Sequence, residues 1–165
     1  MEFLDIVDKN DKIIGKASKE EVYKKLHIHR IVHVLIFNNK RQFLLQLRSK
    51  NVHFCPLHWS TAVGGHVKSG ESYEDAAKRE FKEELGTTSK LSFFSKDFYQ
   101  VPHGPGKILV TFETTYNGSF KIDSKAVAKV GFFSMEEIEK MINKGQKFDP
   151  ELLFLLKKHF LISKK

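Results

Sequence analysis

The amino-acid sequence predicts an α/β (α+β) fold, with helices on the faces of a mixed central sheet, a short β-hairpin before it and C-terminal helices after it. Two observations predict this fold. Short apolar or alternating segments recur along the 165 residues, and segments with a capping residue and helical apolar spacing lie between them. With 41% hydrophobic residues, the chain is expected to bury one core. We therefore expect a single domain over residues 1–165, with residues 1–28 as an N-terminal extension.

Strands are predicted where apolar and β-branched residues run between turn residues. The predicted strands cover residues 3–7, 12–16, 31–37, 42–48, 59–63, 93–99, 108–116 and 130–133. The strand over 59–63 is expected to stop at the pair Gly64 and Gly65, because glycine favours turns over strand interiors.

Helices are predicted where a capping residue precedes a helical apolar pattern. The predicted helices begin at Ser18 (to about residue 26), Ser72 (to Leu85, before Gly86), Ser134 (to about residue 145) and Asp149, which precedes Pro150. A proline at the first helical position suits the last of these, because its missing N–H has no partner there.

Composition and charge narrow the function classes. No apolar run reaches the ~18 residues that a membrane span needs, and the acidic N-terminus does not resemble a signal peptide. A lone cysteine, Cys55, excludes an intrachain disulfide and suits a reducing compartment, so we expect a cytoplasmic protein with no membrane partner. The net charge of +8 attracts small anions. No block of five or six consecutive basic residues is present, so no DNA partner is expected.

The helix over residues 72–85 carries an unusual group of acids. At 100° per residue, Glu80, Glu83 and Glu84 fall within an arc of roughly 100°, beside an apolar stripe. Like charges three and four residues apart destabilise a helix, whereas three carboxylates suit a hard divalent cation such as Mg²⁺. The alternative is a solvated acidic face, which is common on surface helices.

The residues before this helix add to the pattern. Gly64, Gly65 and His66 can bring backbone close to a ligand, because glycine has no Cβ. Arg79, on the helix, can pair with Glu71 and so tie the preceding loop to the helix.

The spacing of seven residues resembles the signature of the Nudix hydrolases. All seven fixed positions match, namely Gly65, Glu71, Arg79, Glu80, Glu83, Glu84 and Gly86, while Phe81 and Thr87 depart from softer aliphatic positions. Residues 5–8, 26–30 and 59–66 resemble the Nudix branch related to isopentenyl-diphosphate isomerase. The resemblance to this branch spans about residues 3–160.

The resemblance implies a Nudix-type α/β/α sandwich that uses Mg²⁺ or Mn²⁺ to cleave a diphosphate linkage in a small, nucleoside diphosphate-linked or related substrate. It implies three groups of residues and, by analogy, a homodimer. The expected metal ligands are Glu80, Glu83, Glu84 and Glu113. The first three also form the catalytic set with Arg79, which orients them. The expected substrate-binding residues are Arg48, Gly64, Gly65 and His66, and Glu71 and Gly86 give structural support. Glu113 is proposed as a ligand or general base because it is the only acid in its strand.

Two other functions stay open. An isomerase resembling isopentenyl-diphosphate isomerase would need a cysteine where this sequence has Gly64, and a pair of glutamates where it has Glu113 alone, although His29 and His66 match two expected histidines. A non-catalytic nucleotide or RNA binder fits the positive charge, but it has no use for carboxylates clustered beside an anion.

Overall fold

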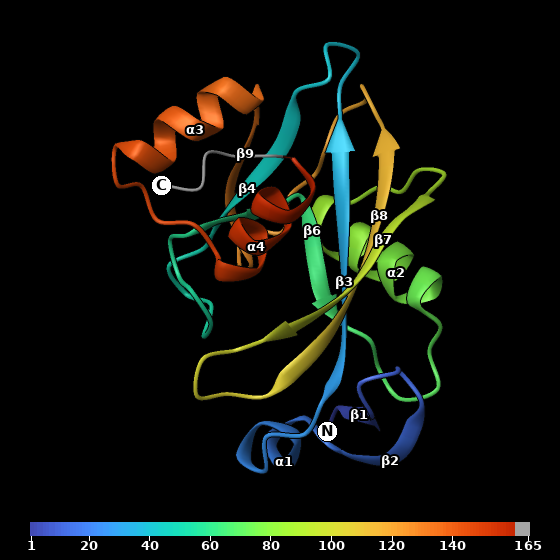
Figure 1. The fold of residues 1–165 in the computed structure, drawn as a ribbon. Helices are drawn as coiled ribbons and strands as arrows, with labels where there is room; N and C mark the ends of the chain where they lie inside the picture. The colour runs from blue at the N-terminus through green and yellow to red at the C-terminus, as the bar shows by residue number, and fades with distance from the viewer. Residues whose placement is uncertain (161–165) are drawn as a thin grey trace.

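The computed structural model describes residues 1–160 and has the predicted mixed fold (Figure 1). The last five residues of the predicted domain lie outside the described range. The strands are β1 (Phe3–Val7), β2 (Ile13–Ser18), β3 (His29–Phe37), β4 (Phe43–Arg48), β5 (Trp59–Thr61), β6 (Val63–His66), β7 (Ser92–Gln100), β8 (Gly106–Thr115) and β9 (Val127–Phe133). The helices are α1 (Lys19–Lys24), α2 (Tyr73–Leu85), α3 (Met135–Asn143) and α4 (Pro150–His159). None of the helices within this range is long and apolar enough to cross a bilayer.

The central sheet combines both strand directions. Its main order is β5-β4-β3-β8-β7, with β6 also paired to β3 and β9 also paired to β4. β3 and β8 run parallel over their full length, and the other pairs are antiparallel. β3 is thus at the centre of the sheet, and its alternate side chains face opposite layers.

Helices cover both faces of the sheet (Figure 1). On one face, Phe81 and Leu85 of α2 pack against Val32 and Val34 of β3. On the other, residues of α3 and α4 pack in a second cluster that includes Leu35 of β3. The result is a helix–sheet–helix sandwich whose two cores are separated by β3.

The N-terminal hairpin is attached to the loop that precedes α2. The backbone N–H of Ser69 donates to the carbonyl of Phe3 at 2.8 Å, and Ser69 Oγ donates to Asp5 Oδ1 at 2.7 Å. Leu4 and Lys68 form an isolated β-bridge. These contacts fix the loop that leads to Glu71 and α2.

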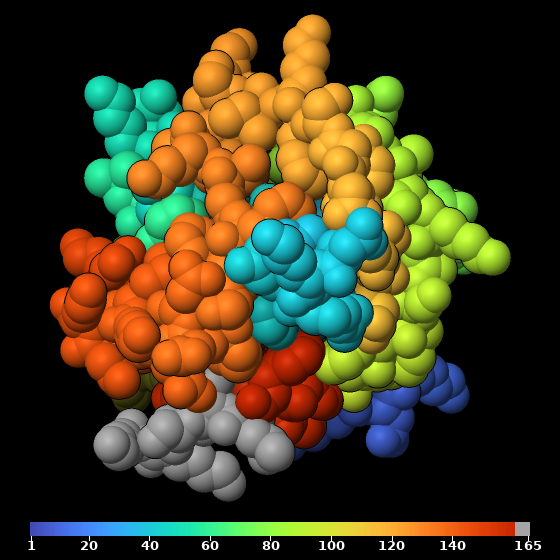
Figure 2. All heavy atoms as spheres, turned by 90° about the horizontal axis from the view of Figure 1, so that it is seen from above, coloured from blue at the N-terminus to red at the C-terminus, as the bar shows by residue number. Residues whose placement is uncertain are grey.

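Segments far apart in sequence meet at the end of the sheet shown in Figure 2. The turn after β3, in cyan, lies against the orange segment that leads to β9. Asn39 and Asn117 join the two segments, because each donates an N–H to the other's side-chain oxygen, at 3.1 and 2.9 Å. This contact holds the end of β8 beside the β3–β4 turn.

The prediction of one strand over residues 59–63 was wrong in two respects. The segment is divided at Ala62 into β5, which pairs with β4, and β6, which pairs with β3. In addition, β6 does not stop at Gly64 and Gly65 but continues through both to His66. Val32 and His33 of β3 pair with these two glycines, so long-range backbone hydrogen bonds override the local preference of glycine for turns. Other element ends agree with the prediction to within a few residues.

The predicted caps of α2 are present. Ser72 Oγ accepts from the N–H of Asp75 at 3.1 Å, and Gly86 ends the helix with φ 72°. A Cβ at Gly86 would lie 2.7 Å from the carbonyl oxygen of Lys121, which is too close for an ordinary contact.

We expect Gly86→Ala to destabilise the protein more than Gly145→Ala. Both glycines have positive φ, 72° and 82°, so alanine is strained at either by ~1–2 kcal/mol. Of these two positions, only Gly86 also brings the added methyl group against backbone, because no atom of residues 1–160 lies within 4 Å of the Cβ position at Gly145. Urea unfolding of both variants measures the difference, and equal losses of stability would contradict the prediction.

Candidate active site

The three glutamates of α2 have very different surroundings. The Glu83 side chain is 55% exposed and the Glu80 side chain 15% exposed, while Glu84 is buried. Glu84 Oε1 accepts from Gln46 Nε2 at 2.6 Å, and Glu84 Oε2 accepts from the N–H of Gly64 at 3.4 Å. The Glu83 side chain therefore faces solvent, whereas the side chain of the next residue, Glu84, points toward the sheet.

Arg79 joins this acidic face to the loop before the helix. The ion pair expected with Glu71 is present and bidentate, at 2.7 and 3.0 Å. The same guanidinium donates to the carbonyl of His66 at 3.0 Å, to Glu80 Oε1 at 2.8 Å and to Glu83 Oε2 at 3.4 Å. Glu71 also accepts from the N–H of Lys68 at 2.9 Å. Arg79 thus fixes the strand end, the loop and two of the acids together.

The surroundings of Glu80 and Glu84 disfavour the ionised form of both carboxyl groups. Burial raises the pKa of Glu80 above its usual value, although the neighbouring Arg79 opposes this. Burial raises the pKa of Glu84 well above its usual range, and the Glu80 carboxylate raises it further. Because each of these carboxyl groups disfavours the ionised form of the other, a cation beside them would stabilise both in their charged forms.

The backbone of β6 approaches the acids closely. A Cβ at Gly65 would overlap the Glu80 carboxylate, and one at Gly64 would lie 3.1 Å from the His33 ring. A side chain at Gly65 would displace the Glu80 carboxylate, and one at Gly64 would push the His33 ring, so glycine suits both positions of β6. The two glycines expected to bind substrate therefore also create the space for the acids.

The donor set of the acidic face suits a divalent metal in kind. Carboxylate oxygens are the ligands that Mg²⁺ prefers, and they crowd together at Glu80 and Glu84. However, no group of three or more His, Cys, Asp or Glu side chains within residues 1–160 is already arranged to hold an ion. Glu80 and Glu83 instead contact Arg79, so these two side chains would have to turn toward a metal.

A cavity of about 980 Å³ opens beside the acidic face. Its walls include seven of the expected site residues, namely Arg48, Gly64, Gly65, His66, Glu80, Glu83 and Glu84. A shallower hollow of about 570 Å³ borders Arg79, Glu80 and Glu83 and is also lined by Met1, Glu2 and Phe3 of the N-terminal segment. The cavity is large enough for a small-molecule substrate.

Glu113 is not brought to this cavity. It lies on β8 beside Leu35 of β3 and is not among the lining residues, while the preceding residue, Phe112, packs in the α2 core. Since neighbouring residues of a strand face opposite sides, Glu113 points to the sheet face that α2 does not cover. Arg48 does line the cavity, and its Nε donates to the carbonyl of Phe54 at 2.8 Å.

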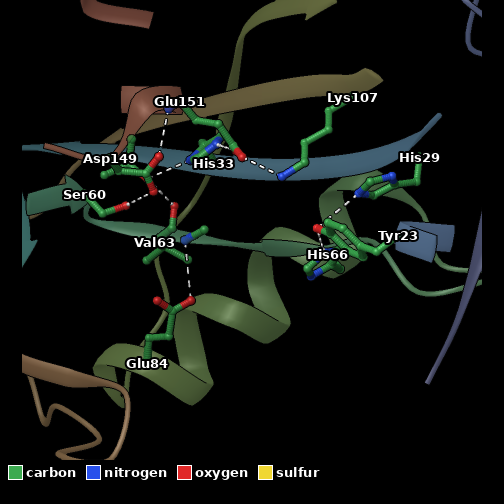
Figure 3. Close-up of polar contacts among 12 residues, drawn as sticks. Tyr23, His29, His33, Ser60, Val63, His66, Glu84, Lys107, Asp149 and Glu151 are labelled. Atoms are coloured by element: carbon green, nitrogen blue, oxygen red, sulfur yellow. Dashed lines mark hydrogen bonds and ion pairs between the residues drawn. The ribbon is translucent and has the colours of Figure 1, made fainter. Parts of the chain in front are cut away.

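His66 is part of a buried cluster with Tyr23 and His29 (Figure 3). The Tyr23 hydroxyl lies 2.7 Å from His66 Nε2 and 3.3 Å from His29 Nε2, and the two imidazole rings stack at 5.6 Å. Burial lowers the pKa of His29 to about 4 and that of His66 to about 3. Both histidines are therefore neutral near pH 7, and the Tyr23 hydroxyl joins them by contacting both Nε2 atoms.

Sequence reasoning missed a second polar group in the cavity wall. Glu151, at the start of α4, accepts from Lys107 Nζ at 2.8 Å and lies 2.8 Å from His33 Nε2, and His33 Nδ1 lies 2.7 Å from Thr61 Oγ1 (Figure 3). All four residues are buried. They come from four different elements, so no sequence motif joins them, and an acid in the first turn of a helix or a lysine before a strand is no signal of a site.

Comparisons with known proteins give a consistent picture. The NUDIX domain family matches residues 27–156. An uncharacterised Nudix hydrolase of Nostoc sp. is 33% identical over 165 residues, covering 94% of this chain and 94% of the relative. An isopentenyl-diphosphate Delta-isomerase of Photorhabdus laumondii is 32% identical over 119 residues, covering 72% of this chain and 67% of that protein.

The fold is also similar to solved structures. The crystal structure of DR0079 from Deinococcus radiodurans superposes with a TM-score of 0.80 at 22% identity, over 95% of this chain and 98% of that one. This likeness includes the N-terminal hairpin region, because the match covers nearly the whole chain.

The lowered pKa of His29 predicts a stability change with pH. The folded protein holds a proton on this ring less readily than the unfolded chain, so stability is complete above about pH 6.5 and falls as the pH drops toward about 4. We expect His29→Gln to reduce this loss by ~1–3 kcal/mol. Urea unfolding at pH 7.5 and pH 4.5 measures it, with His103→Asn, at an exposed loop position, as the control. An unchanged pH dependence in His29→Gln would contradict the prediction.

Proposed function

We propose, from the premise that this chain belongs to the NUDIX domain family and is a Nudix hydrolase, that it cleaves a diphosphate linkage in a nucleoside diphosphate-linked or related substrate with Mg²⁺ or Mn²⁺. One observation carries the proposal. Glu80 and Glu84 crowd together beside Gly65, at the wall of a cavity of about 980 Å³. A pure binding domain gains nothing from this arrangement, since carboxylates repel a diphosphate unless a cation lies between them.

Each acid has a role in this proposal. Glu80, Glu83 and Glu84 would hold the metal, directly or through water, and Glu83 is the most exposed of the three. A bound divalent ion neutralises charge on the diphosphate oxygens and lowers the pKa of a bound water. Glu84, held by Gln46 and the Gly64 amide, is fixed in position, so it sets the inner end of the site.

The remaining site residues orient the acids and the substrate. Glu71 fixes Arg79 by a bidentate pair, and Arg79 in turn holds Glu80 and Glu83 until a cation competes for them. Arg48 and His66 line the cavity and can contact the substrate, while Glu113 is too remote from the cavity lining to serve as a ligand in this arrangement.

An isomerase activity is the second candidate, because relatives about one third identical are isopentenyl-diphosphate Delta-isomerases. The residues weigh against it. Gly64 lies where a proton-transferring cysteine is expected, and the lone Cys55 does not line the cavity. Burial raises the pKa of the Cys55 thiol, which makes it a poorer proton acceptor near neutral pH.

We expect Glu83→Gln and Glu84→Gln to lower metal-dependent hydrolysis by about 100-fold or more, because each removes a charge that holds the cation. Glu74→Gln is the matched control, since Glu74 lies on the same helix but is exposed and pairs with Lys78 at 3.4 Å, away from the acidic face. Turnover is measured as phosphate or nucleotide release over nucleoside triphosphates, nucleotide sugars, dinucleoside polyphosphates and dinucleotide cofactors.

Three results would contradict the proposal. One is inactivity on all four substrate classes with Mg²⁺ and Mn²⁺ present and the fold verified, which favours a binding function. Another is hydrolysis that survives Glu84→Gln unchanged. The third is interconversion of isopentenyl and dimethylallyl diphosphate above background, which would favour the isomerase.

A further inference from the structure

The cavity has a second polar wall, formed by Lys107 and Glu151, which the hydrolytic chemistry does not use. Lys107 lies at the start of β8 and is 4% exposed, and its Nζ is 2.8 Å from Glu151 Oε2. Both residues line the cavity that also contains Glu80 and Glu84. Figure 3 shows this pair on the side of β6 away from Glu84.

The ion pair is stable in its charged form. Burial alone would lower the pKa of Lys107, but the Glu151 carboxylate raises it above its usual value. Burial would raise the pKa of Glu151, but His33 and Lys107 hold it well below its usual range. A buried ion pair contributes little more to stability than apolar residues of the same volume, and this pair lines the cavity, so it is a candidate for contact with a ligand.

Lys107 still has hydrogen-bonding capacity. An ammonium group has three N–H donors, and in the described residues Lys107 donates to Glu151 and lies close to the Tyr23 hydroxyl. Its nitrogen is 5.3 Å from the centre of the Phe54 ring, and Phe54 is 48% exposed and also lines the cavity. A donor, an acceptor and an aromatic wall therefore lie side by side.

We propose that Lys107, Glu151 and Phe54 form a specificity subsite for a flat ring whose edge carries a carbonyl next to an N–H, as a nucleobase such as guanine or uracil does. The inference rests on the proposed function, whose diphosphate would lie at the acidic face. The adjacent Lys107 donor and Glu151 acceptor complement adjacent acceptor and donor atoms on such an edge. The Phe54 ring provides apolar contact for the flat face of the ligand.

The other occupants of this wall are less suitable. A prenyl chain would bury Lys107 and Glu151 against hydrocarbon without giving either a partner, which costs free energy. A second phosphate would meet the carboxylates of Glu151 and Asp149, both buried in this wall.

The test measures binding by calorimetry on the full chain without metal, so that its outcome does not depend on turnover. The probes are guanosine and uridine 5′-monophosphates, ribose 5-phosphate, which lacks the base, and dimethylallyl phosphate. We expect the wild-type protein to bind one of the nucleotides ~10-fold or more tightly than ribose 5-phosphate. Lys107→Met should remove most of this difference and leave the affinity for ribose 5-phosphate unchanged.

Lys96→Met is the matched control. Lys96 also pairs with an acid, Asp11 at 2.6 Å, and lies 5.9 Å from the centre of an aromatic ring, Tyr73, but it does not line the cavity. Its nucleotide affinity should equal that of the wild type. If Lys107→Met fails to fold, as judged by circular dichroism, Phe54→Ala on the exposed loop takes its place in the test. This variant should weaken binding of the nucleotide and leave binding of ribose 5-phosphate unchanged.

Several outcomes would overturn the subsite. One is an equal loss of affinity for nucleotide and for ribose 5-phosphate in Lys107→Met, which would place Lys107 at the phosphate. Another is binding of dimethylallyl phosphate as tight as that of a nucleotide. The third is full nucleotide affinity in Lys107→Met, or in Phe54→Ala if Lys107→Met does not fold. The binding test uses no metal, so its outcome is separate from the hydrolysis assays with Mg²⁺ and Mn²⁺. The expected binding pattern together with no hydrolysis in those assays would contradict the hydrolase proposal alone.

Discussion

The close approach of β6 to helix α2 is the constraint on which the site depends. Gly65 lies against the Glu80 carboxylate and Gly64 against Glu84 and the His33 ring, and a side chain at either position would displace one of these groups. This packing buries Glu84, crowds it against Glu80 and leaves Glu83 at the surface. The raised pKa values of Glu80 and Glu84 therefore depend on the glycines at positions 64 and 65 as well as on the acids themselves.

Arg79 makes the crowded face stable in the absence of a cation. Its guanidinium contacts three carboxylates and one carbonyl, so it replaces part of the positive charge that the acids require. Among these partners Glu71 is the one on the loop, and it anchors Arg79 from a second direction. The same residue that organises the site also competes with an ion for Glu80 and Glu83.

Local chemistry made much of the fold predictable. Ser72 and Gly86 mark the ends of α2 because a cap hydrogen bond and a positive φ are properties of single residues. The Glu71–Arg79 pair was also predictable, since both residues belong to one loop and helix. The course of β6 was not, because its hydrogen bonds come from β3, some thirty residues away.

The second polar wall was out of reach of sequence patterns for the same reason. His33 and Glu151 are 118 positions apart, and only the packing of α4 against β3 brings them together. The apolar strand around His33 predicts that this histidine is buried, as it is, but it does not predict that Glu151 is its partner. Glu113 shows the converse: it is the only acid of its strand and shares a sheet face with Lys107, but it lies six residues further along β8 and does not line the cavity.

The N-terminal hairpin gives the acidic face a neighbour from outside the matched family region, which begins at residue 27. Its first strand is joined to the loop at Ser69, and Met1, Glu2 and Phe3 border the same hollow as Arg79 and Glu83. An affinity tag fused ahead of Met1 would thus emerge at the rim of the proposed metal site. A polyhistidine tag in that place would bring its own metal-binding groups to the acids, so purification tags for this protein belong at the other terminus.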